Sequence, residues 1–317
     1  MKEHTSVMLD EVLAAAASLE KLDVFVDATL GLAGHSSRVL EAFPSAKLYG
    51  FDQDAEAREI AAERLAPFAG RWTIVADNFR RMAELADEPD FAGADAVLFD
   101  LGVSNLQLTE AERGFSFQND GPLDMRMNAD AGAEGRTAAD ILAEADIAEL
   151  TAIFRDYGEE RYAFQIAKGI VRNREHGGTL TTTAELVELI RKILPAPVQR
   201  KMGGHPARRV FQALRIAVND EMGALDEALD GALSILNPGG KIIVISYHSL
   251  EDRMVKHRFR KWKEEGEGEP NPRKPLLPTE EETELNHKSR SAKMRIFQKY
   301  EEETEEEEGS CDAPERA

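Results

Sequence analysis

The chain of 317 residues carries 59 acidic and 39 basic side chains, a formal net charge of −20, and 42% of its residues are hydrophobic. This hydrophobic share can build a sizeable core and excludes a wholly disordered chain. The single cysteine, Cys311, excludes an internal disulfide framework and a cysteine-rich zinc site, and fits a reducing compartment. Asp10 and Glu11 interrupt the N-terminal segment, so it does not resemble a signal peptide, and no stretch approaches the roughly 20 apolar residues of a membrane span. We therefore expect a cytoplasmic protein.

The positive charges are concentrated in three segments that contain no acid. Residues 190–210 and 253–263 hold six Lys or Arg each, and residues 286–300 hold five. The overall acidity argues against nucleic acid as a partner, because phosphate binding needs local positive charge. Acid-free windows of this length are unexpected in so acidic a chain. Solvated helix faces are one explanation, and we favour the other, a surface that faces phosphates.

In chain order, short and nearly continuous apolar runs predict buried strands at residues 24–29, 48–52, 72–76, 96–101 and 241–246. A helical segment, 55–65, lies between the second and third runs. This early alternation of strand and helix predicts a doubly wound α/β sheet.

The pattern changes after Leu106, where strand signals give way to helical segments at 138–157, 159–174 and 182–194. One long helix is expected next, with apolar positions three and four apart from Phe211 to Leu236, ended by Asn237–Gly240. The strand-like residues 294–300 are expected to close the sheet. We therefore divide the chain into a first α/β part (1–106), a helical insertion (107–207), a second α/β part (208–300) and a disordered acidic tail (301–317).

Polar residues and glycines follow four of the predicted strands. They are the loop "DATLGLAGHS" (27–36), Asp52, Asp77 with Phe79, and Asp100. Ligands of open α/β sheets bind at these strand ends, and a carboxylate such as Asp52 can accept hydrogen bonds from ribose hydroxyls. The set indicates an adenosine-type ligand: a dinucleotide, a nucleotide or S-adenosylmethionine. Asp27 would repel a pyrophosphate and the G-x-G-x-x-G fingerprint of a dehydrogenase is missing, so we favour S-adenosylmethionine.

Four longer strings are too distinctive to be generic. They are "EHTSVMLDEV" (3–12), "ERGFSFQNDGPLDMRM" (112–127), "HPARRVFQALRIAVNDE" (205–221) and "LNPGGKIIVISYHSLEDR" (236–253). With them the chain, from His4 to about Tyr300, closely resembles the bacterial enzymes that methylate N4 of a cytosine in the decoding region of 16S rRNA. The resemblance implies a class I S-adenosylmethionine-dependent methyltransferase, Rossmann-like and doubly wound, with an inserted all-helical domain. It also implies S-adenosylmethionine as cofactor and 16S rRNA, within the small ribosomal subunit, as partner.

The resemblance further implies cofactor contacts at matching positions, which are Ala33, Gly34, His35, Asp52, Phe79, Asp100 and Gln107. The family loop usually has Gly-Gly-His where this chain has Ala33-Gly34-His35. Alanine is small, so this departure matters only if the position needs a positive φ.

Methylation of cytosine N4 needs a hydrogen-bond acceptor for the N4 protons, because the N4 lone pair is delocalised into the ring. The base must also be presented unstacked or flipped. Asp100 is our preferred acceptor because it also lies by the cofactor, and the other candidates are Ser104, Asn105, Asp124 and His248. Asp124 has a structural alternative, pairing with Arg126 or capping a turn, and His248 has another, a hydrogen bond in a packed loop.

For RNA affinity we expect contributions from Arg200, Lys201, Arg208, Arg209, Arg253, Lys256, Arg258, Arg260 and Lys261. No metal is expected, since His248 and His257 lack a helical metal-ligand spacing. Two alternatives stay open. A DNA amino-methyltransferase would carry an Asp/Asn/Ser-Pro-Pro-aromatic motif after the fourth strand, which this chain lacks. A non-catalytic rRNA-binding assembly factor with a methyltransferase fold is the second.

Overall fold

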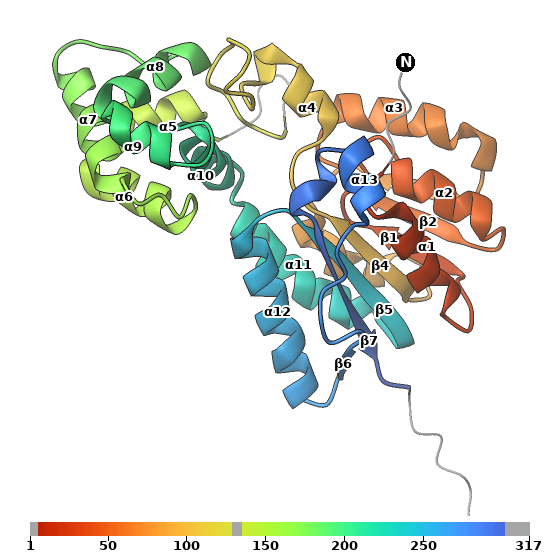
Figure 1. Ribbon diagram of the computed structural model, residues 1–317. Coiled ribbons are helices and arrows are strands. Elements are labelled where there is room, and N and C mark those ends of the chain that lie inside the picture. The colour runs from red at the N-terminus through yellow and green to blue at the C-terminus, as the bar shows by residue number, and fades with distance from the viewer. Residues whose placement is uncertain (1–5, 129–134, 302–317) are drawn as a thin grey trace, which may run out of the picture.

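The computed structural model describes residues 6–128 and 135–301, as a central sheet with a lobe of helices beside it (Figure 1). The seven strands lie in the order β3-β2-β1-β4-β5-β7-β6. They are β1 (Val24–Asp27), β2 (Lys47–Phe51), β3 (Trp72–Val75), β4 (Ala94–Asp100), β5 (Leu236–Ser246), β6 (Gly268–Pro270) and β7 (Lys293–Lys299). The first five run parallel, while β7 is antiparallel to both β5 and β6. The predicted doubly wound α/β sheet is confirmed.

Helices cover both faces of the sheet because its central strands are apolar on both sides. On one face, β4 residues Ala96 and Leu98 share a core with α1 (Leu9–Ala17), α2 (Gly34–Ala42) and α3 (Ala55–Leu65). On the other, Val97 and Phe99 share a core with η2 (Phe79–Asp87), α11 (Glu221–Ile235) and α12 (Ser249–Glu264). This two-sided burial explains why the strands are continuous apolar runs. The chain passes from β1 to β2 and β3 on one side and then crosses to β4 on the other side of β1. Such a reversal of strand order opens a crevice at the carboxyl ends of β1 and β4.

The helical lobe has a hydrophobic core of its own, with Phe154, Ile166 and Leu186 among its buried residues. Its elements are α4 (Asn105–Thr109), η3 (Ala111–Arg113), α5 (Ala138–Glu144), α6 (Ile147–Asp156), α7 (Ala163–Glu175), α8 (Thr183–Ile193), α9 (Ala196–Lys201) and α10 (Arg208–Asn219). Phe211 and Leu214 of α10 belong to this core, so its packing extends beyond the boundary expected at residue 207.

The long helix predicted from Phe211 to Leu236 is wrong, because the structure has two helices that meet at Asp220. Asp220 has φ 46° and ψ 44°, a left-handed conformation that breaks the helix. The apolar stripe is continuous in sequence, but α10 packs into the helical lobe and α11 packs against the sheet. The chain must change direction between the two cores. Periodicity cannot distinguish one helix from two that follow each other in phase.

Two smaller predictions are also corrected. The helix expected over 138–157 is divided into α5 and α6, because the side chain of Asp146 caps α6 by accepting from the N–H of Glu149 (2.8 Å). Residues 237–240 lie inside β5, and α11 already ends at Ile235. Beyond the predicted elements, the structure adds α13 (Glu280–Leu285) and η4 (Ser289–Ser291) between β6 and β7.

No helix in the described residues is both long enough and apolar enough to cross a membrane. The predicted acidic tail, apart from residue 301, and Cys311 lie outside the described part of the chain.

Candidate active site

The first loop and Asp52 meet at the carboxyl ends of β1 and β2. The Asp52 carboxylate accepts from the backbone N–H of Gly31 (2.8 Å) and from that of Asp54 (2.8 Å), so it joins two of the predicted ligand loops. Burial raises the pKa of Asp52 to about 6, although these backbone hydrogen bonds oppose the shift. Asp27, at the end of β1, is fully buried and accepts from the Ser36 hydroxyl (2.5 Å), and burial raises its pKa as well. Asp27 therefore fixes the loop to the start of α2.

Ala33 occupies a strained position at the start of α2. Its φ of 56° and ψ of 33° are left-handed, a conformation that glycine adopts without cost and alanine does not. The positive φ that would make an alanine here significant is therefore present. Its methyl group is completely buried, so this position combines backbone strain with apolar packing.

Asp100 lies at the end of β4, in the crevice beside the first loop. Its backbone N–H donates to the Thr29 hydroxyl (2.7 Å), and its Oδ1 accepts from the Tyr247 hydroxyl (2.6 Å). His35 donates from Nε2 to the carbonyl of Val7 (2.9 Å), and its Nδ1 lies 3.6 Å from Asp100 Oδ2. Burial raises the pKa of Asp100, although the nearby His35 and the hydrogen bond from Tyr247 act in the opposite direction. A quarter of the Asp100 side chain remains exposed. It is thus a constrained carboxylate that solvent or a ligand can reach.

Segments from both ends of the chain close around this carboxylate. The backbone N–H of Met8 donates to Glu282 Oε1 (2.8 Å), across 274 residues. Lys288, just before η4, interacts electrostatically with Asp100, and burial lowers the pKa of Lys288 to about 8. Sequence reasoning missed Tyr247, Glu282 and Lys288, although Tyr247 lies within the distinctive string 236–253. Nothing local in the sequence marks these three residues as part of the site.

Two of the other predicted proton acceptors hold local structure instead. Asp124 forms a bidentate ion pair with Arg126 (2.7 and 2.8 Å); burial raises its pKa, but the hydrogen bonds and charge of Arg126 outweigh this and lower it. His248 caps α12, with Nδ1 accepting from the N–H of Glu251 (3.3 Å). These contacts correspond to the structural alternative for each residue and favour it over a catalytic role.

The residues that follow β4 form a capped helix start. The Ser104 hydroxyl accepts from the N–H of Gln107 (3.2 Å), and Gln107 Oε1 accepts from the N–H of Ser104 (3.1 Å). Gln107 is buried and also donates to Asp54 Oδ2 (3.3 Å). Ser104 is therefore committed to capping, while the half-buried Asn105, first residue of α4, remains a candidate.

An ion pair that the sequence did not reveal joins the helical lobe to the cofactor loops. Arg113 Nη2 lies 2.8 Å from Asp54 Oδ2, and the two side chains are only 11% and 3% exposed. The same guanidinium donates to the carbonyls of Arg126 and Met127. The string 112–127 also folds tightly on itself, since a Cβ at Gly114 or Gly121 would collide with a backbone carbonyl. Its distinctiveness thus reflects close packing beside the site.

One set of potential metal ligands converges within residues 6–128 and 135–301, formed by Glu221, His248 and Glu251. Both carboxylate oxygens of Glu221 already accept from Arg215 (2.7 and 2.8 Å). Glu251 Oε2 accepts two backbone N–H groups, and its Oε1 lies 3.1 Å from His248 Nε2. The guanidinium of Arg215 supplies the positive charge that a cation would bring.

The predicted RNA-binding residues divide by whether their charge is compensated. Of those in the described residues, five are exposed and make no ion pair, namely Arg200, Lys201, Arg208, Arg209 and Lys256. Arg209 does donate to the backbone carbonyl of Glu159. The others have acidic partners: Arg253 pairs with Glu159, Arg258 with Asp226 and Asp230, Arg260 with Glu264, and Lys261 with Glu265. The Arg258 side chain is only 13% exposed, so we drop it from the RNA-contacting set.

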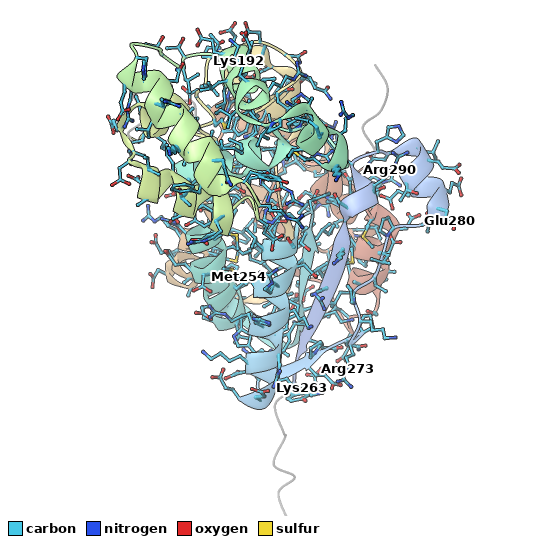
Figure 2. The ribbon with its side chains drawn as sticks, turned by 60° about the vertical axis from the view of Figure 1, so that its left-hand side comes forward. Lys192, Met254, Lys263, Arg273, Glu280 and Arg290 are labelled. Carbon is cyan, nitrogen blue, oxygen red and sulfur yellow. The ribbon has the colours of Figure 1, made fainter. Side chains whose placement is uncertain are left out.

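The basic segments also lie far apart. Figure 2 shows Lys192 at the outer end of the helical lobe and Lys263 at the opposite end of the molecule, with Arg290 beside α13. Only the start of α12 approaches the lobe. The charges on its far end cannot share one short RNA contact with those of the lobe.

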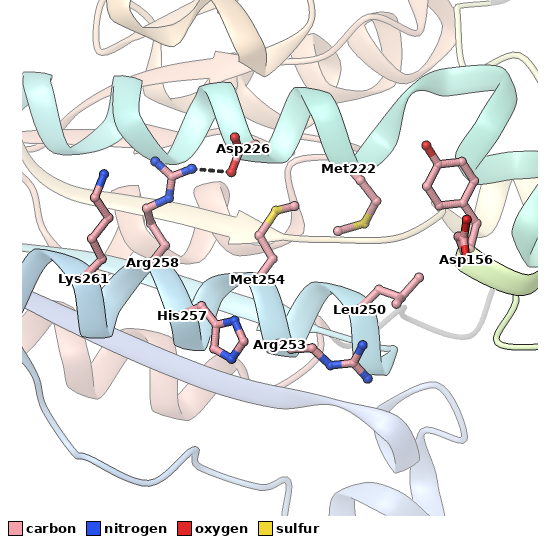
Figure 3. Close-up of a pocket in the computed structure, with 10 residues that line it drawn as sticks. Asp156, Met222, Asp226, Leu250, Arg253, Met254, His257, Arg258 and Lys261 are labelled. Atoms are coloured by element: carbon pink, nitrogen blue, oxygen red, sulfur yellow. Dashed lines mark hydrogen bonds and ion pairs between the residues drawn. The ribbon is translucent and has the colours of Figure 1, made fainter. Parts of the chain in front are cut away.

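A groove of about 530 Å³ lies between α11 and α12 (Figure 3). Its lining is part apolar and part charged, formed by Asp156, Tyr157, Met222, Asp226, Leu250, Arg253, Met254, His257, Arg258 and Lys261. Arg258 crosses the groove to bind Asp226, and Arg253 and Lys261 have acidic partners. Each of these three cations is therefore paired, although the partners of Arg253 and Lys261, which are Glu159 and Glu265, lie outside the lining.

The model of the MraW methylase family matches residues 1–300. The chain belongs to this family. It is 44% identical over 312 residues to ribosomal RNA small subunit methyltransferase H of Symbiobacterium thermophilum, covering 93% of this chain and 96% of that protein. It is 50% identical over 263 residues to the protein of the same name from Mycolicibacterium smegmatis, covering 81% of this chain and 69% of that protein.

Solved structures resemble the fold more loosely. An rRNA methylase from Streptococcus thermophilus has a TM-score of 0.42 at 12% identity, covering 90% of this chain and 92% of that one. A Streptococcus mutans protein in complex with SAH has a TM-score of 0.42 at 11% identity, covering 93% and 99%. As a member of a methylase family with this sheet, the chain is a Rossmann-like methyltransferase, and its cofactor is S-adenosylmethionine.

Proposed function

We propose that this protein transfers a methyl group from S-adenosylmethionine to the exocyclic N4 of one cytidine in the decoding region of 16S rRNA. The observation that carries the proposal is Asp100, a constrained and partly exposed carboxylate at the strand ends where the cofactor loops meet. The names of the curated relatives support rRNA of the small subunit as the substrate class. The four strings quoted from the sequence support cytosine N4 as the acceptor.

The residues at the strand ends fit the cofactor. Asp52 is a half-buried carboxylate that is ionised above a pH of about 6 and can accept hydrogen bonds from ribose hydroxyls. The half-buried ring of Phe79 offers a flat apolar surface to a base. We assign the remaining contacts to Ala33, Gly34, His35, Asp100 and Gln107. When bound, S-adenosylmethionine supplies a methyl group on a sulfonium sulfur, which keeps the electron pair of the broken carbon–sulfur bond.

Asp100 then acts as the acceptor for the N4 protons. A hydrogen bond from N4–H to the carboxylate draws the lone pair out of conjugation with the ring. N4 forms its bond to carbon with that lone pair and sheds one proton, which the carboxylate takes. Holding N4 in line with the methyl carbon is the other part of the catalysis, a proximity effect.

The helical insertion serves RNA recognition in this proposal. Arg200, Lys201 and Arg208 on α9 and α10 are among its exposed cations without an ion pair in the described residues, and Lys256 adds one from α12. They would hold phosphates beside a flipped cytidine and so supply the salt-dependent part of the affinity. The substrate would be the assembled small subunit, in the cytoplasm.

Methylation assays with labelled S-adenosylmethionine on assembled small subunits, free 16S rRNA and duplex DNA test the proposal. We expect the label in 16S rRNA and none in duplex DNA. Mass mapping should place the label on a decoding-region cytidine as N4-methylcytidine. Asp100→Asn should abolish transfer, while Asp87→Asn, an exposed residue at the end of η2, should not. Label in duplex DNA would favour a DNA amino-methyltransferase. Cofactor binding without turnover on any substrate would favour an assembly factor.

A further inference from the structure

Tyr247 touches the proposed proton acceptor directly, yet the mechanism above gives it no role. Its hydroxyl donates to Asp100 Oδ1 at 2.6 Å. Its ring lies against the turn that follows β4, because a Cβ at Gly102 would be only 3.4 Å from Tyr247 Cδ2. One side chain therefore contacts the carboxylate and also occupies the space beside Gly102, two residues beyond it.

The backbone of Tyr247 is itself held in place. Glu251 Oε2 accepts from the N–H of Tyr247 (2.8 Å) and from that of His248 (3.1 Å). Burial raises the pKa of Glu251, but His248 and Arg215 outweigh this and lower it, so the carboxylate stays ionised. Charge-assisted hydrogen bonds of this kind are about twice as strong as neutral ones. The hydroxyl is thus presented from a rigid turn.

The two oxygens of Asp100 differ as a result. Oδ1 accepts a short hydrogen bond from Tyr247, whereas Oδ2 has only His35 Nδ1 at 3.6 Å. We propose that Tyr247 is a positioning residue for methyl transfer, which fixes Oδ1 and directs Oδ2 toward the N4 protons of the bound cytosine. The inference rests on the function proposed above.

The charged groups around Asp100 make this contact measurable by pH. His35 on α2, Tyr247 after β5 and Lys288 before η4 favour its ionised form, while Asp27 on β1 and Glu251 on α12 oppose it. Removing the Tyr247 hydroxyl removes one group that lowers the pKa of Asp100. The carboxylate then ionises at higher pH. A residue with a purely structural role would leave this titration unchanged.

The test compares Tyr247→Phe with Tyr49→Phe in single-turnover methylation of the small subunit between pH 5 and 9. Tyr49 is a matched control, since its hydroxyl makes only a long contact with the carbonyl of Asp90 (3.4 Å). For Tyr247→Phe we expect a methylation rate about tenfold lower. We also expect the acid limb of the pH–rate profile, where the rate falls because Asp100 is protonated, to lie about one pH unit higher. Both effects correspond to the loss of one hydrogen bond to a charged group. Cofactor and RNA dissociation constants should stay within about twofold of the wild-type values.

A wild-type rate and limb in Tyr247→Phe would overturn the positioning role, and so would a loss confined to cofactor affinity. A limb shifted equally in Tyr49→Phe would also overturn it. The melting temperature of each variant shows whether the fold is intact. With cofactor saturating at every pH, so that protonation of Asp52 near pH 6 does not limit the rate, the shift of the acid limb between wild type and Tyr247→Phe reports on Asp100. An inactive wild-type enzyme would refute the proposed function instead, so the two failures are distinguishable.

Discussion

Replacing Ala33 with glycine tests whether the first loop of this chain is strained. A left-handed conformation costs a residue with a Cβ about 1–2 kcal/mol, and Ala33 has φ 56°. Glycine would remove this strain, but losing the buried methyl group costs about 0.8 kcal/mol. The greater freedom of glycine in the unfolded chain costs about 0.4–1 kcal/mol more. The contributions nearly cancel, so we expect a free energy of unfolding within about 1 kcal/mol of the wild-type value.

Ala61 provides the control, because it is equally buried but lies in the middle of α3. Ala61→Gly should cost about 2 kcal/mol, the sum of about 1 kcal/mol in helix propensity and about 0.8 kcal/mol in burial. Urea unfolding of the two variants, compared by midpoint and slope, measures the difference. If Ala33→Gly destabilises the protein as much as Ala61→Gly, the strain argument is refuted.

Three further predictions concern charge. Arg113→Ala should destabilise the fold by about 3–5 kcal/mol, because it leaves the carboxylate of Asp54 buried without its partner; an unchanged thermal midpoint would contradict this. Lys201→Ala should weaken RNA binding and lower the slope of log K against log salt by about 0.7–0.9, whereas Arg258→Ala should leave that slope unchanged in filter-binding titrations. Cofactor affinity, measured by calorimetry, should fall as the pH drops through about 6, because protonated Asp52 loses acceptor capacity, and Asp52→Asn should show no such step.

Much of the sheet could be predicted because its signals are local. A strand buried on both faces is apolar over most of its length, and the central residues of β1, β2 and β4 show this directly in sequence. The residue that ends each strand is equally visible, which is how Asp52 and Asp100 were found. The contact between Asp52 and the first loop then follows, since parallel strands bring their carboxyl ends to one edge.

The roles of polar side chains were harder to predict, because composition does not distinguish a cap from a catalyst. Asp124 and His248 have the residue types of general bases, but one is paired with Arg126 and the other caps α12. The role of each side chain is set by its contact with a partner two or three residues away, and the sequence does not specify the geometry of that contact. The break at Asp220 escaped prediction for a related reason, since the two helices keep a common apolar period.

The amino-acid sequence by itself determined the α/β class, the positions of the strands and the carboxylates that end them, because burial and backbone conformation act over a few residues. Only the tertiary structure decided which groups surround Asp100. His35, Tyr247 and Lys288 reach it from three distant parts of the chain. The left-handed conformation of Ala33 was likewise set by the packing around it, so that the cost of an alanine in this loop became visible only in the fold.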